Sequence, residues 1–191
     1  MLGKTSAYEL VVIGVSTGAF ETLRILLPVF PADYTLPIVV VQHLHPWQTE
    51  NTLLSTYDKM CPLAVIEAQE KERIQGGAIY FAPANYHLLV EDDFTFALSI
   101  DARVHYVRPS IDVFLESAVD VYGAAVVGVI LTGANQDGAA GMRRVKKRGG
   151  LTIVEDPQTA VVKTMPQATL EATQIDYILP IDQIGQLLCG L

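Results

Sequence analysis

Three polar residues whose side chains can together perform nucleophilic chemistry each follow an apolar run of this sequence. They are Ser16, His43 and Asp137, and the runs before them are residues 9–13, 37–41 and 124–131. A serine becomes a nucleophile when a general base takes its proton, and that base needs a carboxylate to fix its tautomer and stabilise its cation. The three residue types therefore match the three roles of a serine hydrolase.

The turn that holds Ser16 is Gly14-Val15-Ser16-Thr17-Gly18, between an expected strand and an expected helix. Glycines on both sides allow a sharp turn, and a G-x-S-x-G turn presents its serine oxygen at the top of a sheet. Two other interpretations remain open from the turn alone. A Gly-rich turn after a first strand can hold a phosphate at a helix N-terminus, and serine is a preferred helix N-cap.

The other two residues also have structural interpretations. His43 could be a structural histidine at a strand end, and His45 is a rival for the role of base. Asp137 could cap the helix that follows it, as could Asn135. The occurrence of all three residues at the ends of strands favours catalysis, because ligands of parallel sheets bind beyond the carboxyl ends of the strands.

The chain order Ser, His, Asp separates this sequence from the α/β-hydrolases. In those enzymes the acid precedes the histidine, and the nucleophile does not follow the first strand. The Ser16 turn therefore does not by itself indicate an α/β-hydrolase.

The pattern of apolar runs and turns predicts strands that alternate with helices, which indicates a mainly parallel sheet covered by helices on both faces. The expected strands lie at 9–13, 37–41, 64–66, 78–82, 86–90, 94–100, 124–131, 151–154 and 177–179. Helices are expected at 21–27, 166–172 and 181–188. Three more are expected with one clear end each: one that ends at about 60, one that begins near 108 and one that ends at 148. The section from about 63 to 100 is interpreted as an antiparallel excursion.

Composition narrows the class of protein. The 191 residues, half of them apolar, suit one α/β domain spanning 1–191 with a short lead at 1–8. The net charge of −8 argues against nucleic-acid binding. We expect no membrane insertion, because no long apolar run occurs, and a cytoplasmic location, because no secretory segment precedes the first strand. Cys61 and Cys189 are interpreted as reduced thiols, and we expect neither a metal nor a cofactor.

Two further features have a structural and a functional interpretation. His87 could line the site or merely satisfy a hydrogen bond, and the second interpretation is favoured. A basic cluster within residues 143–148 is typical of a solvated helix face near a helix C-terminus. Its functional alternative is a docking patch for an acidic partner.

With these residues assembled, the chain resembles the catalytic domain of the chemotaxis protein-glutamate methylesterase (CheB) family over roughly residues 9–188. The blocks that carry the resemblance are Ile13-Gly14-Val15-Ser16-Thr17-Gly18, Gln42-His43, Tyr80-Phe81-Ala82-Pro83 with His87, Arg108-Pro109-Ser110-Ile111-Asp112, Ile130-Leu131-Thr132-Gly133 with Asp137-Gly138-Ala139, and Met165-Pro166. The resemblance implies a doubly wound α/β sheet with an antiparallel portion.

The resemblance also implies roles and an activity. Ser16 matches the nucleophile of the family, His43 its base and Asp137 the residue that orients the base, while the backbone N–H groups of Thr17 and Ala134 match its oxyanion site. The family hydrolyses glutamate methyl esters on the cytoplasmic helices of chemoreceptors, and some members deamidate glutamine there. We therefore expect a chemoreceptor, or a related methylated signalling protein, as the partner.

The sequence departs from the family pattern in three respects. Ala19 replaces a second glycine of the serine turn, and Ala134-Asn135 replaces methionine-glycine after Thr132-Gly133. The receiver domain typical of the family is not expected before Ser16, so a separate receiver protein could supply the regulation. A non-catalytic signalling module of the same fold is the alternative to the esterase, and a phosphate- or nucleotide-binding domain is a weaker one.

Overall fold

A parallel sheet forms the centre of the molecule in the computed structural model, which describes residues 7–43 and 50–191. Within these residues the sheet has seven strands in the order β3-β4-β2-β1-β7-β8-β9, and every neighbouring pair is parallel. The strands are β1 (Leu10–Val15), β2 (Ile38–Gln42), β3 (Ala64–Glu67), β4 (Ala78–Phe81), β7 (Val126–Ile130), β8 (Leu151–Glu155) and β9 (Tyr177–Leu179).

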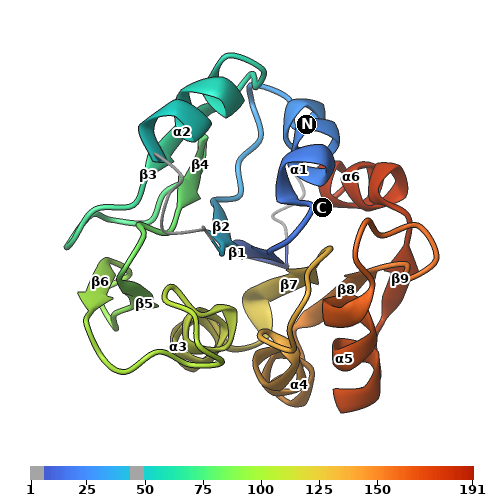
Figure 1. Cartoon of the computed structure of the whole chain (residues 1–191). Helices are drawn as coiled ribbons and strands as arrows, with labels where there is room; N and C mark the ends of the chain where they lie inside the picture. Colours follow the sequence, from blue (N-terminus) through green and yellow to red (C-terminus); the bar gives the residue numbers. More distant parts are fainter. Residues whose placement is uncertain (1–6, 44–49) are drawn as a thin grey trace.

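Helices cover both faces of this sheet (Figure 1). On one face lie α1 (Ala19–Leu26), the 3-10 turn η1 (Leu27–Val29), α2 (Glu50–Asp58) and α6 (Ile181–Cys189). On the other lie α3 (Ile111–Tyr122), which continues into the 3-10 turn η2 (Gly123–Ala125), α4 (Ala139–Lys147), α5 (Thr164–Ala172) and a small antiparallel pair, β5 (His87–Val90) and β6 (Phe96–Ser99). The expected α/β fold, with helices on both faces, is confirmed.

The central strands are apolar along their whole length because both of their faces are covered. Every residue of β1, β2 and β7 is buried. Successive side chains of a strand point to opposite faces, so β1 sends Val11 and Ile13 to the α1 face and Leu10 and Val12 to the α3 face. The same alternation decides on which side the residues just beyond each strand emerge.

The prediction for residues 63–100 was partly wrong. Of the four strands in this section, β5 and β6 pair antiparallel, whereas β3 and β4 extend the main sheet in parallel from β2. A short apolar run has the same pattern in either orientation, and the direction follows from the connections. The chain returns from β3 to β4 through residues 68–77, which cross the face of the sheet and contribute Ala68 and Ile74 to the core on the α3 face.

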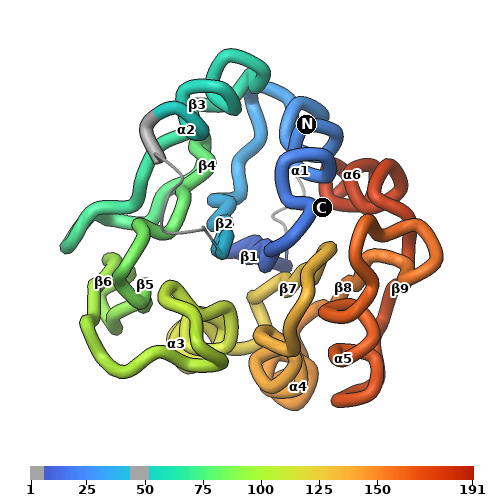
Figure 2. Tube along the Cα trace, in the orientation of Figure 1, coloured from blue at the N-terminus to red at the C-terminus, as the bar shows by residue number. Residues whose placement is uncertain are grey.

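The chain changes direction across the sheet next to β1. After β1 the chain forms β2 on one side of it and continues to β3 at that edge of the sheet. It later returns to the centre, where β7 pairs with β1 on its opposite side (Figure 2). Doubly wound sheets bind ligands at such a switch point, beyond the carboxyl ends of the strands. Ser16 follows β1, His43 follows β2 and Asp137 lies in the loop after β7, so the fold brings all three to this place.

Candidate active site

Three hydrogen bonds join the Ser16 turn to the residues that directly follow the neighbouring strand β7. Leu131 donates its N–H to the Gly14 carbonyl, and Ser16 donates its N–H to the Thr132 carbonyl, both at 2.9 Å. The Thr132 hydroxyl in turn donates to the Thr17 carbonyl at 2.8 Å. Ser16 itself is only partly buried. The turn therefore holds the serine in a fixed place while its side chain stays accessible.

Both glycines of this turn are required by geometry. A Cβ on Gly14 would lie 2.6 Å from a methyl carbon of Ile111, which places the start of α3 directly against the turn. Gly18 has a φ of +87°, a conformation that disfavours other residues, and it is the N-cap residue of α1. Ser16 is thus not the cap of that helix, which disfavours the capping interpretation.

His43 lies beside Ser16, just beyond the end of β2. The last residue pair of β1 and β2 is Val15 with Gln42, so Ser16 and His43 each stand one position beyond it. Alternation along the two strands directs both side chains toward the α3 face. The His43 N–H donates to the Val15 carbonyl at 3.1 Å, which continues the pairing and fixes the backbone at this position.

Asp137 lies next to His43 and is completely buried. The Nε2 atom of His43 is 2.8 Å from Oδ2 of Asp137, and the two side chains are 6% and 0% exposed. The structure therefore brings together two of the three residues that the sequence singled out, from strands that are not adjacent in the sheet.

Three groups at the start of α3 also donate hydrogen bonds to Asp137. The Ser110 hydroxyl donates to Oδ1 at 2.8 Å, the Ile111 N–H to Oδ2 at 2.6 Å and the Asp112 N–H to Oδ1 at 3.1 Å. Asp137 therefore caps α3 and not α4, whose N-cap residue is Gly138 and carries no side-chain cap. The interpretation of Asp137 as the cap of the helix that follows it is therefore wrong, because the carboxylate caps the neighbouring helix α3 instead.

These contacts decide the charge of Asp137. Burial alone raises the pKa of a carboxyl group, but the hydrogen bond and charge of His43, followed by the bonds from Ile111 and Ser110, outweigh it and hold the pKa of Asp137 below its usual value. An ionised Asp137 accepts a proton-bearing Nε2, so the free lone pair of His43 is on Nδ1. Nδ1 is then the atom that can act as a base.

Asn135 lies against that lone pair. Its amide nitrogen is 3.4 Å from Nδ1 of His43, and its amide oxygen accepts the N–H of Asp137 at 3.1 Å. Among residues 7–43 and 50–191, the Ser16 hydroxyl makes no hydrogen bond of its own. Hydrogen bonds between nucleophile and base commonly tighten only when substrate is bound.

The backbone near Ser16 offers donors for a developing negative charge. Within the described residues, the N–H groups of Thr17 and Ala134 take part in no hydrogen bond. Beneath them, buried Glu155 accepts the Thr132 N–H at 2.8 Å, and burial raises the pKa of its carboxyl group although that hydrogen bond lowers it. The assignment of Thr17 and Ala134 as oxyanion donors stays a prediction.

The remaining histidines have different places. His87 is buried and satisfies two hydrogen bonds, accepting the Ser110 N–H at Nδ1 and bonding the Ala102 carbonyl through Nε2. This agrees with the favoured interpretation. His45, the rival base, lies outside the described residues.

A cluster of possible metal ligands was not visible in the sequence. Ligand atoms of His105, Asp112 and Asp137 lie within 4.8 Å of one another. Both oxygens of Asp137 already accept N–H or O–H bonds, and Asp112 accepts the N–H of Gly141 at 2.7 Å and faces His105 at 3.4 Å. Hydrogen bonding between two helix ends accounts for this cluster without an ion.

The basic cluster is largely paired with acidic neighbours. Arg144 and Arg148 both bind Asp120, and Lys146 binds Asp176. This pairing agrees with the interpretation of a solvated helix face.

A doubly wound α/β fold with a serine, a histidine and a buried aspartate at its switch point is the architecture of a serine hydrolase. Comparison with known sequences narrows this class. The model of the family described as CheB methylesterase matches residues 11–188. The chain therefore belongs to the CheB methylesterase family, and the resemblance noted in its sequence is confirmed.

Relatives and a solved structure agree with this assignment. A protein of Leptospira interrogans (serovar copenhageni), whose provisional name is protein-glutamate methylesterase/protein-glutamine glutaminase, is 46% identical over 184 residues, which cover 96% of this chain and 95% of that protein. A protein-glutamate methylesterase/protein-glutamine glutaminase of Symbiobacterium thermophilum is 40% identical over 93% of this chain but only 49% of its own length. The crystal structure of the Thermotoga maritima CheB methylesterase catalytic domain superposes with a TM-score of 0.91 at 36% identity, covering 97% of this chain and 99% of that one.

Two parts of the site were missed by reasoning from sequence. Ser110 and Asp112 stand in one of the blocks that resemble the family, but no role followed from their spacing. A serine before an apolar helix is a visible N-cap signal, and Ser110 does cap α3 through the Val113 N–H at 3.4 Å. That the cap also binds Asp137 depends on tertiary contact and has no signal in the local sequence. Within the described residues, no helix is long and apolar enough to cross a membrane.

Proposed function

We propose that this protein is a protein-glutamate methylesterase that hydrolyses methyl esters of glutamate side chains on the cytoplasmic helices of chemoreceptors. The observation that carries the proposal is the 2.8 Å bond between Nε2 of His43 and Oδ2 of buried Asp137, next to the tethered Ser16 turn. Family membership and the names of the relatives support the substrate class.

In the proposed reaction, the Ser16 oxygen attacks the ester carbonyl while Nδ1 of His43 takes the serine proton. Asp137 remains ionised and stabilises the imidazolium through Nε2. The N–H groups of Thr17 and Ala134 bind the oxyanion. His43 then returns its proton to the departing methoxide, which leaves as methanol.

Water completes the cycle by attacking the acyl-enzyme with His43 as its base, which yields a glutamate carboxylate and restores the Ser16 hydroxyl. A glutamine side chain would react by the same steps and release ammonia. We place this activity in the cytoplasm, with a separate receiver protein as a source of regulation. The alternative is a binding module of the same fold that has no esterase activity.

The test follows methanol release from receptor-containing membranes that carry labelled methyl esters. The proposal predicts release by the wild-type chain and a loss of about 10³-fold or more in Ser16→Ala. Ser55→Ala, an exposed serine on α2, is the matched control and should release methanol at the wild-type rate.

Release that survives in Ser16→Ala would contradict the proposed nucleophile. Receptor binding without any Ser16-dependent release would favour the non-catalytic module.

A further inference from the structure

Asp112 is buried in the first turn of α3 and reaches across to the next helix. It is 5% exposed, and its Oδ1 atom accepts the N–H of Gly141 in the first turn of α4 at 2.7 Å. The N-cap residue of α4, Gly138, has no side chain to satisfy these N–H groups. Asp112 therefore supplies from α3 the cap that α4 lacks.

Asp137 makes the reciprocal contact. It stands immediately before α4, and it accepts the N–H groups of Ile111 and Asp112 at the start of α3. Each helix thus has its N-terminus held by a carboxylate that belongs to the other. A displacement of α4 relative to α3 would therefore move Asp137, and with it the hydrogen bond that orients His43.

Packing leaves little room for such a displacement as long as the two caps are made. A Cβ on Gly141 would lie 2.7 Å from the Leu115 side chain and 3.3 Å from the Asp112 backbone. Helices this close are held at one separation, and the Asp112 to Gly141 hydrogen bond lies at their point of contact.

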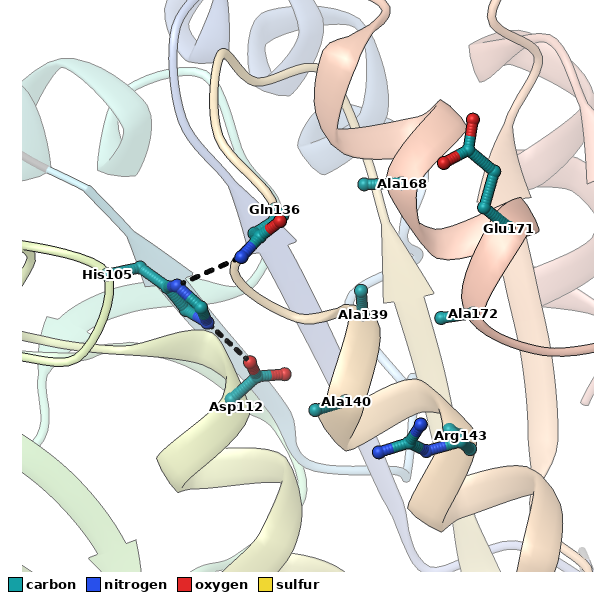
Figure 3. Close-up of a pocket in the computed structure, with 9 residues that line it drawn as sticks. All are labelled: His105, Asp112, Gln136, Ala139, Ala140, Arg143, Ala168, Glu171 and Ala172. Atoms are coloured by element: carbon teal, nitrogen blue, oxygen red, sulfur yellow. Dashed lines mark hydrogen bonds and ion pairs between the residues drawn. The ribbon is translucent and has the colours of Figure 1, made fainter.

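The far side of Asp112 borders a pocket of about 330 Å³ between the start of α3, α4 and α5 (Figure 3). In Figure 3, His105 lies between Gln136 and Asp112, and its Nε2 atom is 3.4 Å from Oδ2 of Asp112. Arg143 of α4 and Glu171 of α5 line the same pocket. The charged groups around Asp112 are therefore Asp137 with His43 behind it, His105, Arg143 and Glu171.

We propose that Asp112 is a positioning residue of the methylesterase: in its ionised form it holds the start of α4 against α3 and thereby keeps Asp137 where it orients His43. The inference rests on the proposed function of Ser16, His43 and Asp137. A charged acceptor at a helix N-terminus is stronger than a neutral one, because it meets both the N–H group and the positive end of the helix dipole.

The titration of Asp112 makes this role measurable. Burial raises its pKa to about 6, with the neighbouring charge of Asp137 adding to the effect and the Gly141 N–H and His105 opposing it. Below that pH the wild-type residue is itself neutral, so replacing it with a neutral residue should then change little. Above it, the same replacement removes the charge that holds α4.

The experiment compares wild type with Asp112→Asn, which keeps an acceptor for Gly141 but has no charge. The rate is that of Ser16 modification by a fluorophosphonate, measured by mass spectrometry, so that it does not depend on the receptor. We expect a wild-type to variant rate ratio of about tenfold at two pH units above the Asp112 pKa, falling toward one at two units below it. Asp182→Asn, the exposed first-turn aspartate of α6, is the matched control and should give a ratio of one throughout.

A second variant makes the test independent of how Asp112→Asn folds. His105 lowers the pKa of Asp112, so the fall in the rate of Ser16 modification that accompanies protonation of Asp112 should occur at a higher pH in His105→Gln than in wild type. A ratio that stays constant with pH, whatever its size, would mean that Asp112 is only structural and would overturn the proposal. If wild type reacts with the fluorophosphonate at Ser16 but releases no methanol from receptors, the proposed substrate fails while the test of Asp112 remains valid.

Discussion

Asp137 and Asp112 are the same residue type in nearly the same setting, yet their pKa values are shifted in opposite directions. Both are buried, and each accepts N–H groups from the start of a helix. The pKa of Asp137 is lowered, because His43 and the α3 donors outweigh its burial, whereas burial raises the pKa of Asp112 to about 6.

The difference comes from the number and kind of donors around each carboxylate. Asp137 accepts four hydrogen bonds, one of them from a histidine that becomes a cation during the proposed reaction. Asp112 has the Gly141 N–H and a histidine at 3.4 Å. When two carboxylates share one site, their titrations separate, and the one with more hydrogen-bond donors and a cationic partner is ionised first as pH rises. The comparison teaches that burial at a helix N-terminus does not by itself decide whether the pKa of an aspartate is raised or lowered.

The largest expected effect comes from Asp137→Asn. The amide cannot accept hydrogen bonds at both of its ends, so it loses either the bonds of His43 and Ile111 or those of Ser110 and Asp112. We expect kcat to fall by about 10³- to 10⁴-fold, against about tenfold for Asp112→Asn. Steady-state methanol release measures both. Equal losses in the two variants would erase the proposed division of roles.

A smaller effect is expected from Ser110→Ala, which removes one donor from Asp137 and the cap on the Val113 N–H. Stability should fall by about 1–2 kcal/mol, and kcat by less than about tenfold. Urea denaturation and methanol release provide the two values. Ser117→Ala on the same helix is the control, because its hydroxyl also accepts a backbone N–H, that of Val90, away from the site. A similar loss of kcat in both variants would show that Ser110 acts only through helix stability.

The two aspartates should also have opposite effects on stability as pH changes. Asp137, with its lowered pKa, stabilises the fold above its unfolded value of about 3.9 and loses this contribution as pH falls. Asp112, with its raised pKa, carries a cost of up to about 3 kcal/mol above pH about 6, and the cost disappears as pH falls toward about 4.

Thermal denaturation across this range should therefore find Asp112→Asn at least as stable as wild type near neutral pH, with the difference vanishing in acid. Asp137→Asn should be less stable than wild type near neutral pH. An Asp112→Asn variant that is strongly destabilised near neutral pH would contradict the assigned charge state.

The smallest effect is expected from Asn135→Ala. Its amide meets Nδ1 of His43 at 3.4 Å, which is a long hydrogen bond, and its oxygen accepts one N–H from Asp137. We expect a change in kcat of less than about threefold, measured beside Gln136→Ala, which contacts His105 and not His43. A tenfold or greater loss would place Asn135 among the groups that orient the histidine.

Much of the fold and part of the site could be predicted from the sequence. Fully apolar runs mark strands that are covered on both faces, and polar residues at their ends mark the edge where ligands bind, so Ser16, His43 and Asp137 were found together. The sharp turn that Gly14 and Gly18 were expected to allow is present, and Gly18 adopts a φ of +87° in it.

The rest depends on tertiary contacts that leave no local pattern. The spacing of residues does not reveal that Asp137 caps α3 or that Asp112 caps α4, because each carboxylate serves a helix other than the one it adjoins. Nor could the direction of β3 and β4 be read from short apolar runs. The atom of His43 that we propose as the base follows only from which nitrogen faces Asp137.

The central claim is that Ser16 is a nucleophile activated by His43 and Asp137, and covalent labelling tests it most directly. Treat the full chain with a fluorophosphonate near neutral pH and locate the adduct by peptide mass spectrometry. The account predicts one adduct per chain, on Ser16, formed by wild type and strongly slowed in both His43→Ala and Asp137→Asn. Labelling of Ser16 at an equal rate in all three proteins, or no labelling of Ser16 in wild type, would contradict it.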